Sequence, residues 1–487
     1  MIRPVTGCLS VSLLALAVAG ISSTAQAATD AWLIGGGNFL DNSQGQIEQN
    51  VLWLDRLLQP RVQSLSIYYA AGVDADGKVP QKDVVFWAPP AETSAAMQPL
   101  ARVFAPVGDN GKNYKFHDVQ GVRGSTAKDS LVPALTRDFA AVKPGDDILL
   151  VYNGHGGGNP NTSLNHLKLW GEQTLDVGEL SALFNKAPAS STVRFLMTQC
   201  YSGGFQKLIF EQPDSRRFNQ QKRCGFMAES AWRESEGCAL GINKEDFRDY
   251  TTYFFAALSG STRLDTVLPT DPDLNHDGKV SYREAHLYTL QTAVSTDLSR
   301  ATSEVFLEEW QPWFVRWDNT PNNPDSEYWH IAEQVAASNH LTLDSRLLWL
   351  QQRELERQMQ ASKTQQEALL INIGEEQKSL QAQLAAQWPE LRNPYTLGYV
   401  QVIRNDLDAV QDSILAQPQY ADLKASQDQY LQLQQQELEL ERHFTQIEKV
   451  LRMKKLARLQ AAFQRYASIE ERQQYQQLLS CEEGVLE

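Results

Sequence analysis

Two stretches of the chain decide its fold: ILLVYNGHGGG at residues 148–158 and VRFLMTQCYSGGF at residues 193–205. Each opens with an apolar run that is short enough to be a buried parallel strand. Each ends in glycines just after a residue that can carry chemistry, His155 in the first stretch and Cys200 in the second. The chain between them has room for a hairpin and a crossover helix. We therefore expect both residues at the carboxyl ends of neighbouring strands, the edge where open α/β sheets bind ligands.

His155 and Cys200 have the chemistry of a general base and a nucleophile. A thiol attacks a carbonyl well only as the thiolate, or beside a base, usually His, that takes its proton. The glycines let a substrate backbone approach, and the amides of Gly156 and Cys200 are candidate donors to an oxyanion. The alternative is a buried core cysteine and an unrelated loop histidine. We favour the dyad because both residues follow strands and precede glycines.

These motifs resemble those of the caspase-like cysteine peptidases of clan CD. Residues 153–156 (NGHG) are similar to the histidine motif of that clan, and residues 198–204 (TQCYSGG) to its cysteine motif. The resemblance covers about residues 28–320 and implies a caspase-like, mostly parallel sheet flanked by helices. It also implies a cysteine endopeptidase, with a peptide ligase as the close variant.

Within the clan, the legumain family is the most similar. Residues 32–38 (WLIGGGN) resemble its first strand, and this implies that Asn38 orients the catalytic His. Residues 233–238 (RESEGC) are similar to its substrate-lining strand, which implies a substrate-binding role for Ser235. Legumains carry an Asp before the catalytic His, whereas this chain has Gly154, so asparaginyl specificity is not carried over.

The wall of the substrate groove is expected at residues 228–239, where an extended substrate could pair with the backbone as an added strand. Glu234, Glu236 and Asp249 are the acidic candidates for the pocket that receives the residue before the cut. An acidic lining would favour a basic or amide side chain. The alternative for each of the three is a solvated surface carboxylate, so residue preference stays open.

Residues 273–284 (DLNHDGKVSYRE) have the spacing of an EF-hand-type calcium loop. The predicted ligands are Asp273, Asn275, Asp277, the backbone carbonyl of Lys279, Ser281 and Glu284. Gly278 permits the sharp bend, and Glu284 can bind with both oxygens. The alternative is an acidic turn without an ion. One such site predicts a structural Ca²⁺ rather than a calcium sensor.

The first 27 residues have the features of a secretory signal peptide: a basic start, a short apolar stretch and an A-x-A cleavage site. This predicts a periplasmic or secreted protein, where disulfides can form. Cys224 and Cys238 could close a small loop, and Cys481 has no obvious partner. Cys200 must stay reduced to act.

Strand and helix patterns alternate from residue 31 onward, which predicts an α/β fold with a parallel sheet. We expect strands at 64–69 and 83–87 and helices at 45–58 and 125–142, with Ser125 as the N-cap of the last. The polar segment 211–222 is expected to be an exposed loop. In clan CD a loop near this point is often cut during activation, so self-cleavage there is a hypothesis.

From about residue 340 the composition shifts to Gln, Glu, Leu, Ala and Arg, with apolar residues at coiled-coil-like spacing. The predicted division is a peptidase domain at 28–335 and an all-α domain of long antiparallel helices at 340–487. These helices could bind a partner, drive self-association or fold over the active site. Simple packing on the peptidase domain is the further alternative.

Two classes of function remain open from the sequence. The favoured one is an exported, calcium-stabilised cysteine endopeptidase that acts on a protein or peptide substrate. The other is a catalytically silent scaffold that presents its helical tail to a protein partner. The net charge of −15 argues against nucleic acid and anionic membrane surfaces as partners, and no apolar segment after the first 27 residues is long enough to span a membrane.

Overall fold

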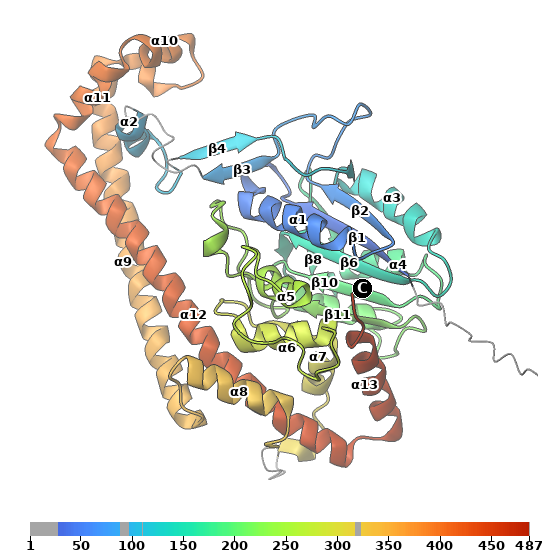
Figure 1. Ribbon diagram of the computed structural model, residues 1–487. Coiled ribbons are helices and arrows are strands. Elements are labelled where there is room, and N and C mark those ends of the chain that lie inside the picture. The colour runs from blue at the N-terminus through green and yellow to red at the C-terminus, as the bar shows by residue number, and fades with distance from the viewer. Residues whose placement is uncertain (1–27, 88–96, 110, 317–322, 487) are drawn as a thin grey trace, which may run out of the picture.

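The computed structural model describes residues 28–87, 97–109, 111–316 and 323–486 (Figure 1). The predicted signal peptide, residues 1–27, lies outside the described residues. In the part that is described, no helix combines the length and the apolar character that crossing a bilayer requires.

The centre of the described structure is a seven-stranded sheet with the order β12-β11-β10-β6-β1-β2-β5. The neighbours are parallel except for β12, which runs antiparallel to β11. In chain order the strands are β1 (Thr29–Gly36), β2 (Ser64–Tyr69), β5 (Val122–Gly124), β6 (Asp147–Gly154), β10 (Val193–Met197), β11 (Arg223–Met227) and β12 (Arg300–Ala301). The predicted mixed α/β fold with a mostly parallel sheet is confirmed.

Helices cover both faces of this sheet (Figure 1). Leu150 and Tyr152 of β6 pack with α3 (Lys128–Ala140) and α4 (Val177–Phe184) on one face. Leu149 and Val151 pack on the other face with α1 (Gly45–Leu58), α5 (Tyr250–Ser259) and α6 (Tyr282–Thr292). Burial on both sides explains why residues 148–152 of β6 form a continuous apolar run that does not alternate with polar residues.

Two small sheets lie beside the central one. The first pairs β3 (Val84–Trp87) with β4 (Lys112–Lys115), and the second joins β7 (Gly156–Gly157), β8 (His166–Leu169) and β9 (Gln173–Asp176). The strand expected at 83–87 therefore exists but lies outside the central sheet. The helix expected at 125–142 spans 128–140, and Ser125 is not its N-cap, because its hydroxyl donates to the Ala70 carbonyl at 2.7 Å in the loop before the helix.

The remaining helices belong mainly to the C-terminal half. They are α2 (Met97–Phe104), α7 (Thr302–Glu309), α8 (Glu327–Ser338), α9 (Ser345–Gln387), α10 (Leu397–Asn405), α11 (Leu407–Leu415), α12 (Pro418–Tyr466) and α13 (Ile469–Glu482). Short 3-10 helices span Leu40–Asn42, Thr162–Leu164, Ser202–Ile209, Lys244–Asp246, Trp313–Arg316 and Pro389–Arg392.

Helices α9 and α12 form a long antiparallel pair, which we call the arm, with α10 and α11 at its tip (Figure 1). The expectation of long antiparallel helices is confirmed. At the base, one apolar cluster joins the arm to α6, α7 and α8. At the tip, a second cluster joins it to α2. The arm is thus packed on the rest of the chain at both ends.

A disulfide joins Cys224 of β11 to Cys481 of α13. The expectation that Cys224 could pair with Cys238 is wrong, and Cys481 has a partner after all. The reason is tertiary: α13 returns to the central sheet and lies against β11, where Arg194 of β10 also donates to the Cys481 carbonyl at 2.8 Å. Cys200 and Cys238 are free thiols.

Replacing Cys224 and Cys481 together with Ala should lower the free energy of unfolding by about 2–4 kcal/mol, because this crosslink closes a long loop in the unfolded chain. The midpoint of urea unfolding measures the effect, with Cys238→Ala as the matched control that removes a thiol without removing the crosslink. An unchanged midpoint in the double variant would contradict this prediction.

Candidate active site

The candidate site forms where β6 and β10 end side by side. The two strands pair in parallel from Ile148 and Val193 to Tyr152 and Met197, so their chains leave the sheet at one edge. Beyond that edge the backbones touch: a Cβ added to Gly156 would lie 2.2 Å from the Cys200 carbonyl oxygen. Only glycine fits at position 156.

The glycine before His155 also has a steric cause. A Cβ at Gly154 would lie 2.6 Å from the Gly36 carbonyl oxygen and 2.9 Å from the Tyr152 hydroxyl. The Asp that legumains carry at this point has no room in this backbone arrangement. The departure from the legumain pattern is therefore built into the contact between β6 and β1.

The imidazole of His155 is held by a row of side-chain amides. Its Nε2 donates to Gln44 Oε1 at 2.7 Å, Gln44 Nε2 donates to Asn42 Oδ1 at 3.2 Å, and Asn42 Nδ2 donates to Asn38 Oδ1 at 2.6 Å. Because Gln44 presents its oxygen, the hydrogen of the neutral ring lies on Nε2. Nδ1 then carries the free lone pair and is the basic nitrogen.

Within this row of side chains, Gln44 and not Asn38 is thus the one that hydrogen-bonds to the His155 imidazole. Asn38, which the resemblance implies as the orienting residue, stands two amides further along the row. Gln44 occupies the N-cap position of α1, and its side chain makes no capping hydrogen bond. The side chain is therefore available to the histidine. The sequence signal that could have found it is the polar residue at the start of α1.

Burial and the nearby positive charge of Lys168 lower the pKa of His155 to about 4, although a backbone hydrogen bond with Asn42 acts in the opposite direction. The ring is therefore neutral at pH 7 and able to accept a proton. Lys168 lies on β8, and its amide also donates to the His155 carbonyl at 2.8 Å.

The thiol of Cys200 lies against Ser235. Its Sγ is 3.4 Å from the Ser235 amide nitrogen and 3.8 Å from the Ser235 hydroxyl. The pKa of Cys200 is raised above its usual value, mainly by burial and further by the charges of Glu234 and Asp297, and the hydrogen bonds from Ser235 offset part of this increase. Ser235 therefore donates hydrogen bonds that stabilise the thiolate form.

A second thiol occupies the site, which the sequence reasoning missed. Cys238 Sγ lies 3.5 Å from His155 Nδ1, the nitrogen with the free lone pair. Within the described residues, no hydrogen bond joins His155 to Cys200 directly. Burial raises the pKa of Cys238 well above its usual value, and the charge of Cys200 raises it further. The available signal was the presence of a cysteine in the segment that resembles a substrate wall.

The segment that carries Ser235 and Cys238 is irregular. β11 ends at Met227, and the described chain has no strand from there to α5, so the expected substrate-lining strand at 233–238 is wrong as secondary structure. Ser235 bonds to Cys200 and Glu236 bonds to Asp297, and these contacts use the backbone groups that a ladder would need.

The structure separates the three acidic pocket candidates. Glu234 is exposed and accepts from the Tyr201 hydroxyl at 3.3 Å, beside Cys200. Glu236 forms an ion pair with Arg442 of the arm. Asp249 is buried and accepts from Asn50 at 2.8 Å. Of the three, only Glu234 lies exposed near Cys200.

The predicted calcium loop is a tight turn closed by its own side chains. Asp273 accepts from the amide of Gly278 at 2.8 Å, and Gly278 has φ +86°. Glu284 accepts from the amides of Asn275 at 3.1 Å and Ser281 at 2.9 Å, so its two oxygens join the start and the end of the loop. The donor set is all oxygen, as Ca²⁺ prefers. The described residues contain no group of three or more His, Cys, Asp or Glu arranged around one metal position.

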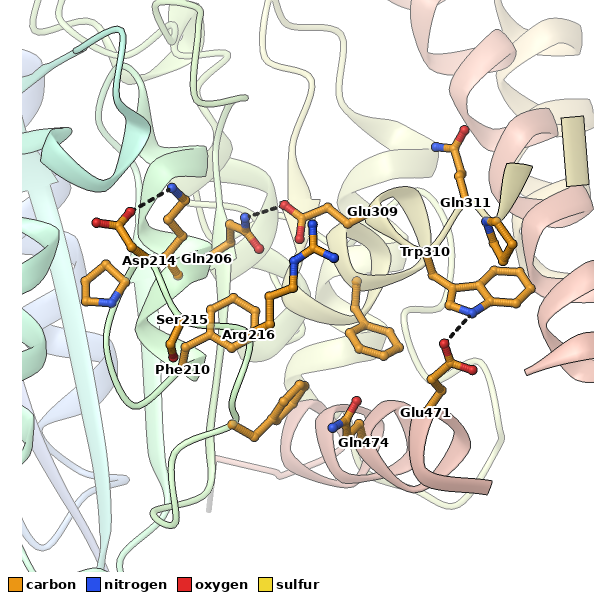
Figure 2. A pocket seen from close by; sticks show the side chains of 15 residues that line it. Gln206, Phe210, Asp214, Ser215, Arg216, Glu309, Trp310, Gln311, Glu471 and Gln474 are labelled. Carbon is orange, nitrogen blue, oxygen red and sulfur yellow. Dashed lines mark hydrogen bonds and ion pairs between the residues drawn. The ribbon is translucent and has the colours of Figure 1, made fainter. Parts of the chain in front are cut away.

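A separate cavity of about 750 Å³ lies between the 206–218 segment and helices α7 and α13 (Figure 2). Phe210, Phe218, Phe306 and Trp310 form its apolar part, and Trp310 donates to Glu471 at 3.0 Å. None of its lining residues is a predicted site residue. The segment expected as an exposed loop thus forms one wall of this cavity.

No family model and no curated protein matches the chain. A solved structure of a Geobacter sulfurreducens protein, determined as a structural-genomics target, is similar with a TM-score of 0.33 and 13% sequence identity. The match covers 56% of this chain and 93% of that one. These values are too low to carry an argument about fold or activity.

Replacing Lys168 with Met should raise the pKa of His155 above about 4, because the positive charge that opposes protonation is removed. NMR of the ¹⁵N-labelled ring, followed as a function of pH, measures the shift and also reports the tautomer. Lys143→Met, a change of the same kind at an exposed site, is the control. An equal pKa in both variants would overturn this account of the shift.

Proposed function

We propose that the protein is a cysteine endopeptidase with Cys200 as nucleophile and His155 as general base. The observation that carries the proposal is the meeting of two strand ends at one sheet edge. There, a neutral histidine with a fixed tautomer and a partly exposed thiol lie on touching backbones. The fold is of the class that places ligand sites at this edge.

In the proposed reaction, His155 Nδ1 takes the proton of the Cys200 thiol as the sulfur attacks the substrate carbonyl carbon. The resulting imidazolium gives its proton to the leaving amine, and an acyl-enzyme remains on Cys200. Water then hydrolyses the acyl-enzyme, with His155 again as base. Attack by an amine in place of water would make the enzyme a peptide ligase.

The amides of Gly156 and Cys200 are the proposed oxyanion donors. Just before β7, the hydrogen bond between the two chains runs from the Lys168 amide of β8 to the His155 carbonyl. Gly156 and Leu167 are therefore a non-hydrogen-bonded pair, and the Gly156 amide points away from β8. This orientation supports its assignment as a donor.

Two parts of this proposal rest on sequence. Export rests on the signal peptide-like features of residues 1–27, and the legumain-like class rests on the motifs around His155 and Cys200. For the calcium loop, the all-oxygen donor set and the bend at Gly278 support a structural Ca²⁺ bound by the predicted ligands within residues 273–284.

A peptidyl probe with a thiol-reactive group should label Cys200 of the full chain. His155→Ala should slow this labelling by about 10²–10⁴-fold because the base is lost, and Cys200→Ala should abolish it. Mass spectrometry locates the label, and a peptide library then gives the residue preference.

Equal and slow labelling of Cys200 and Cys238, unaffected by His155→Ala, would refute the peptidase. The scaffold function, with the arm as the partner-binding part, would then be the better account. Cleavage of a peptide library that persists in Cys200→Ala would refute the assigned nucleophile.

Calcium should raise the unfolding temperature of the full chain, by an amount equivalent to about 2.7 kcal/mol at a concentration 100-fold above the dissociation constant. Glu284→Gln should lose this response, because Gln keeps the helix cap with Ser281 but lacks the carboxylate. Asp271→Asn, just before the loop, is the control that should respond normally. Calorimetric titration measures binding directly, and no heat in the wild type would exclude the site.

A further inference from the structure

The site holds two free thiols, Cys200 and Cys238, and one loop contacts both Cys200 and His155. Ser235, whose amide lies 3.4 Å from Cys200 Sγ, and Cys238, whose Sγ lies 3.5 Å from His155 Nδ1, belong to the same loop and are three residues apart. The negative charge of a Cys200 thiolate is, after burial, the largest influence on the pKa of Cys238. The charges of both sulfurs also raise the pKa of the Tyr152 hydroxyl.

The loop is anchored on both sides of Cys238. On one side, the Glu236 amide donates to Asp297 at 2.7 Å. On the other side, the Ala239 amide donates to the side chain of Gln46 at 3.0 Å. Between the anchors lies Gly237, with φ +136°, a conformation that residues with side chains rarely adopt. Between the two anchored amides, Gly237 is the position where no side chain restricts the backbone.

We propose that Cys200 and Cys238 are a redox pair: a low-molecular-weight disulfide such as glutathione disulfide oxidises them to a reversible Cys200–Cys238 disulfide that switches the site off. This proposal deepens the proposed function. The formation of the disulfide does not depend on that function, but the statement that the oxidised form is an inactive enzyme does. The chain already carries one disulfide, between Cys224 and Cys481, so the folded protein is compatible with an oxidising environment.

The chemistry proceeds in two exchanges. In the first, the Cys200 thiolate attacks one sulfur of glutathione disulfide, and a mixed disulfide forms as one glutathione thiolate leaves and takes up a proton. In the second, His155 Nδ1 takes the proton of Cys238, and the Cys238 sulfur attacks the Cys200 sulfur. The second glutathione leaves as thiolate and receives the proton from His155. Two protein thiols are oxidised, and one glutathione disulfide is reduced to two glutathiones.

The order of the two exchanges follows from the environment of each sulfur. Burial raises the pKa of Cys200, but less than that of Cys238, because hydrogen bonds from Ser235 partly offset it; Cys200 therefore reacts first with the external disulfide. Cys238 has a base within 3.5 Å but a strongly raised pKa, so it acts only on a sulfur brought next to it. The reversible disulfide would also protect Cys200 from irreversible oxidation to sulfinic acid.

The reduced full chain is treated with glutathione disulfide. Acid then stops the exchange, N-ethylmaleimide alkylates the remaining free thiols, and mass spectrometry identifies the modified and crosslinked peptides. The wild type should give a crosslinked peptide pair that contains Cys200 and Cys238. Cys238→Ser should stop at a glutathione adduct on Cys200. Cys200→Ala should leave Cys238 unmodified by glutathione, because the raised pKa of the Cys238 thiol keeps it protonated and it does not start the exchange.

A glutathione adduct on Cys200 that persists in the wild type as it does in Cys238→Ser would overturn the proposal. So would modification of Cys238 in Cys200→Ala at the rate at which the wild type reacts. The Cys224–Cys481 crosslink and the circular dichroism spectrum of each variant show that it has folded, and a wild-type protein that folds but forms no crosslink also overturns the proposal.

The same samples separate this proposal from the proposed function. Labelling by the peptidyl probe should be lost in the oxidised wild type and restored by reduced glutathione. If the crosslink forms but the reduced protein does not react with the probe, the redox pair stands and the peptidase fails. If the probe labels Cys200 and no crosslink forms, the peptidase stands and the redox pair fails.

Discussion

The parallel pairing of β6 with β10 is the constraint on which the candidate site depends. Both strands are buried on both faces, so their register is specified by the packing of helices above and below the sheet. The end of the pairing is then fixed by Asn153, whose side-chain Nδ2 donates to Thr198 Oγ1 at 3.0 Å and to Thr251 Oγ1 at 2.8 Å. These bonds tie the end of β6 to the turn before Cys200 and to α5. The separation of the two reactive groups is therefore a property of the core rather than of flexible loops.

The parts of the structure that depend on local pattern could be predicted from the sequence. The helix expected at 45–58 and the strand expected at 64–69 have those bounds in the structure. Apolar runs that end in glycine gave the two strands of the site correctly, because a strand buried on both faces needs such a run and the close approach at Gly156 excludes a side chain. The strand at 83–87 was assigned to the wrong sheet, since pattern alone does not say which edge a strand joins.

The contacts that complete the site lay beyond sequence reasoning, because each depends on the approach of distant segments. Cys238 meets His155 across 83 positions, and Cys224 meets Cys481 across 257. The segment from residue 228 to 249 has no periodicity that would place its side chains. The resemblance to legumains directed attention to Asn38, whereas the chain reaches His155 through Gln44, whose position follows from how the 3-10 helix Leu40–Asn42 leads into α1.

The arm adds a second constraint, which acts on the loop that carries Ser235 and Cys238. At its base, Arg452 of α12 pairs with the buried Glu304 and the partly buried Glu308 of α7. Breaking a buried pair of this kind costs about 3–5 kcal/mol, so α12 cannot leave the base without a large loss of stability. The arm therefore holds its position against the sheet domain.

From that fixed base, α12 contacts the loop through two further ion pairs, Arg442 with Glu236 and Glu448 with Arg233. Arg233 in turn accepts, through its carbonyl, the amide of Tyr201 at 2.8 Å, directly after Cys200. The loop is thus held to the arm on one side and to the segment that follows Cys200 on the other. The amide of Ala239 is also bonded to Gln46 of α1, so a shift of the whole loop would break this hydrogen bond and the ion pairs with α12 at the same time. Gly237 lies between these contacts and has no side chain that restricts its backbone.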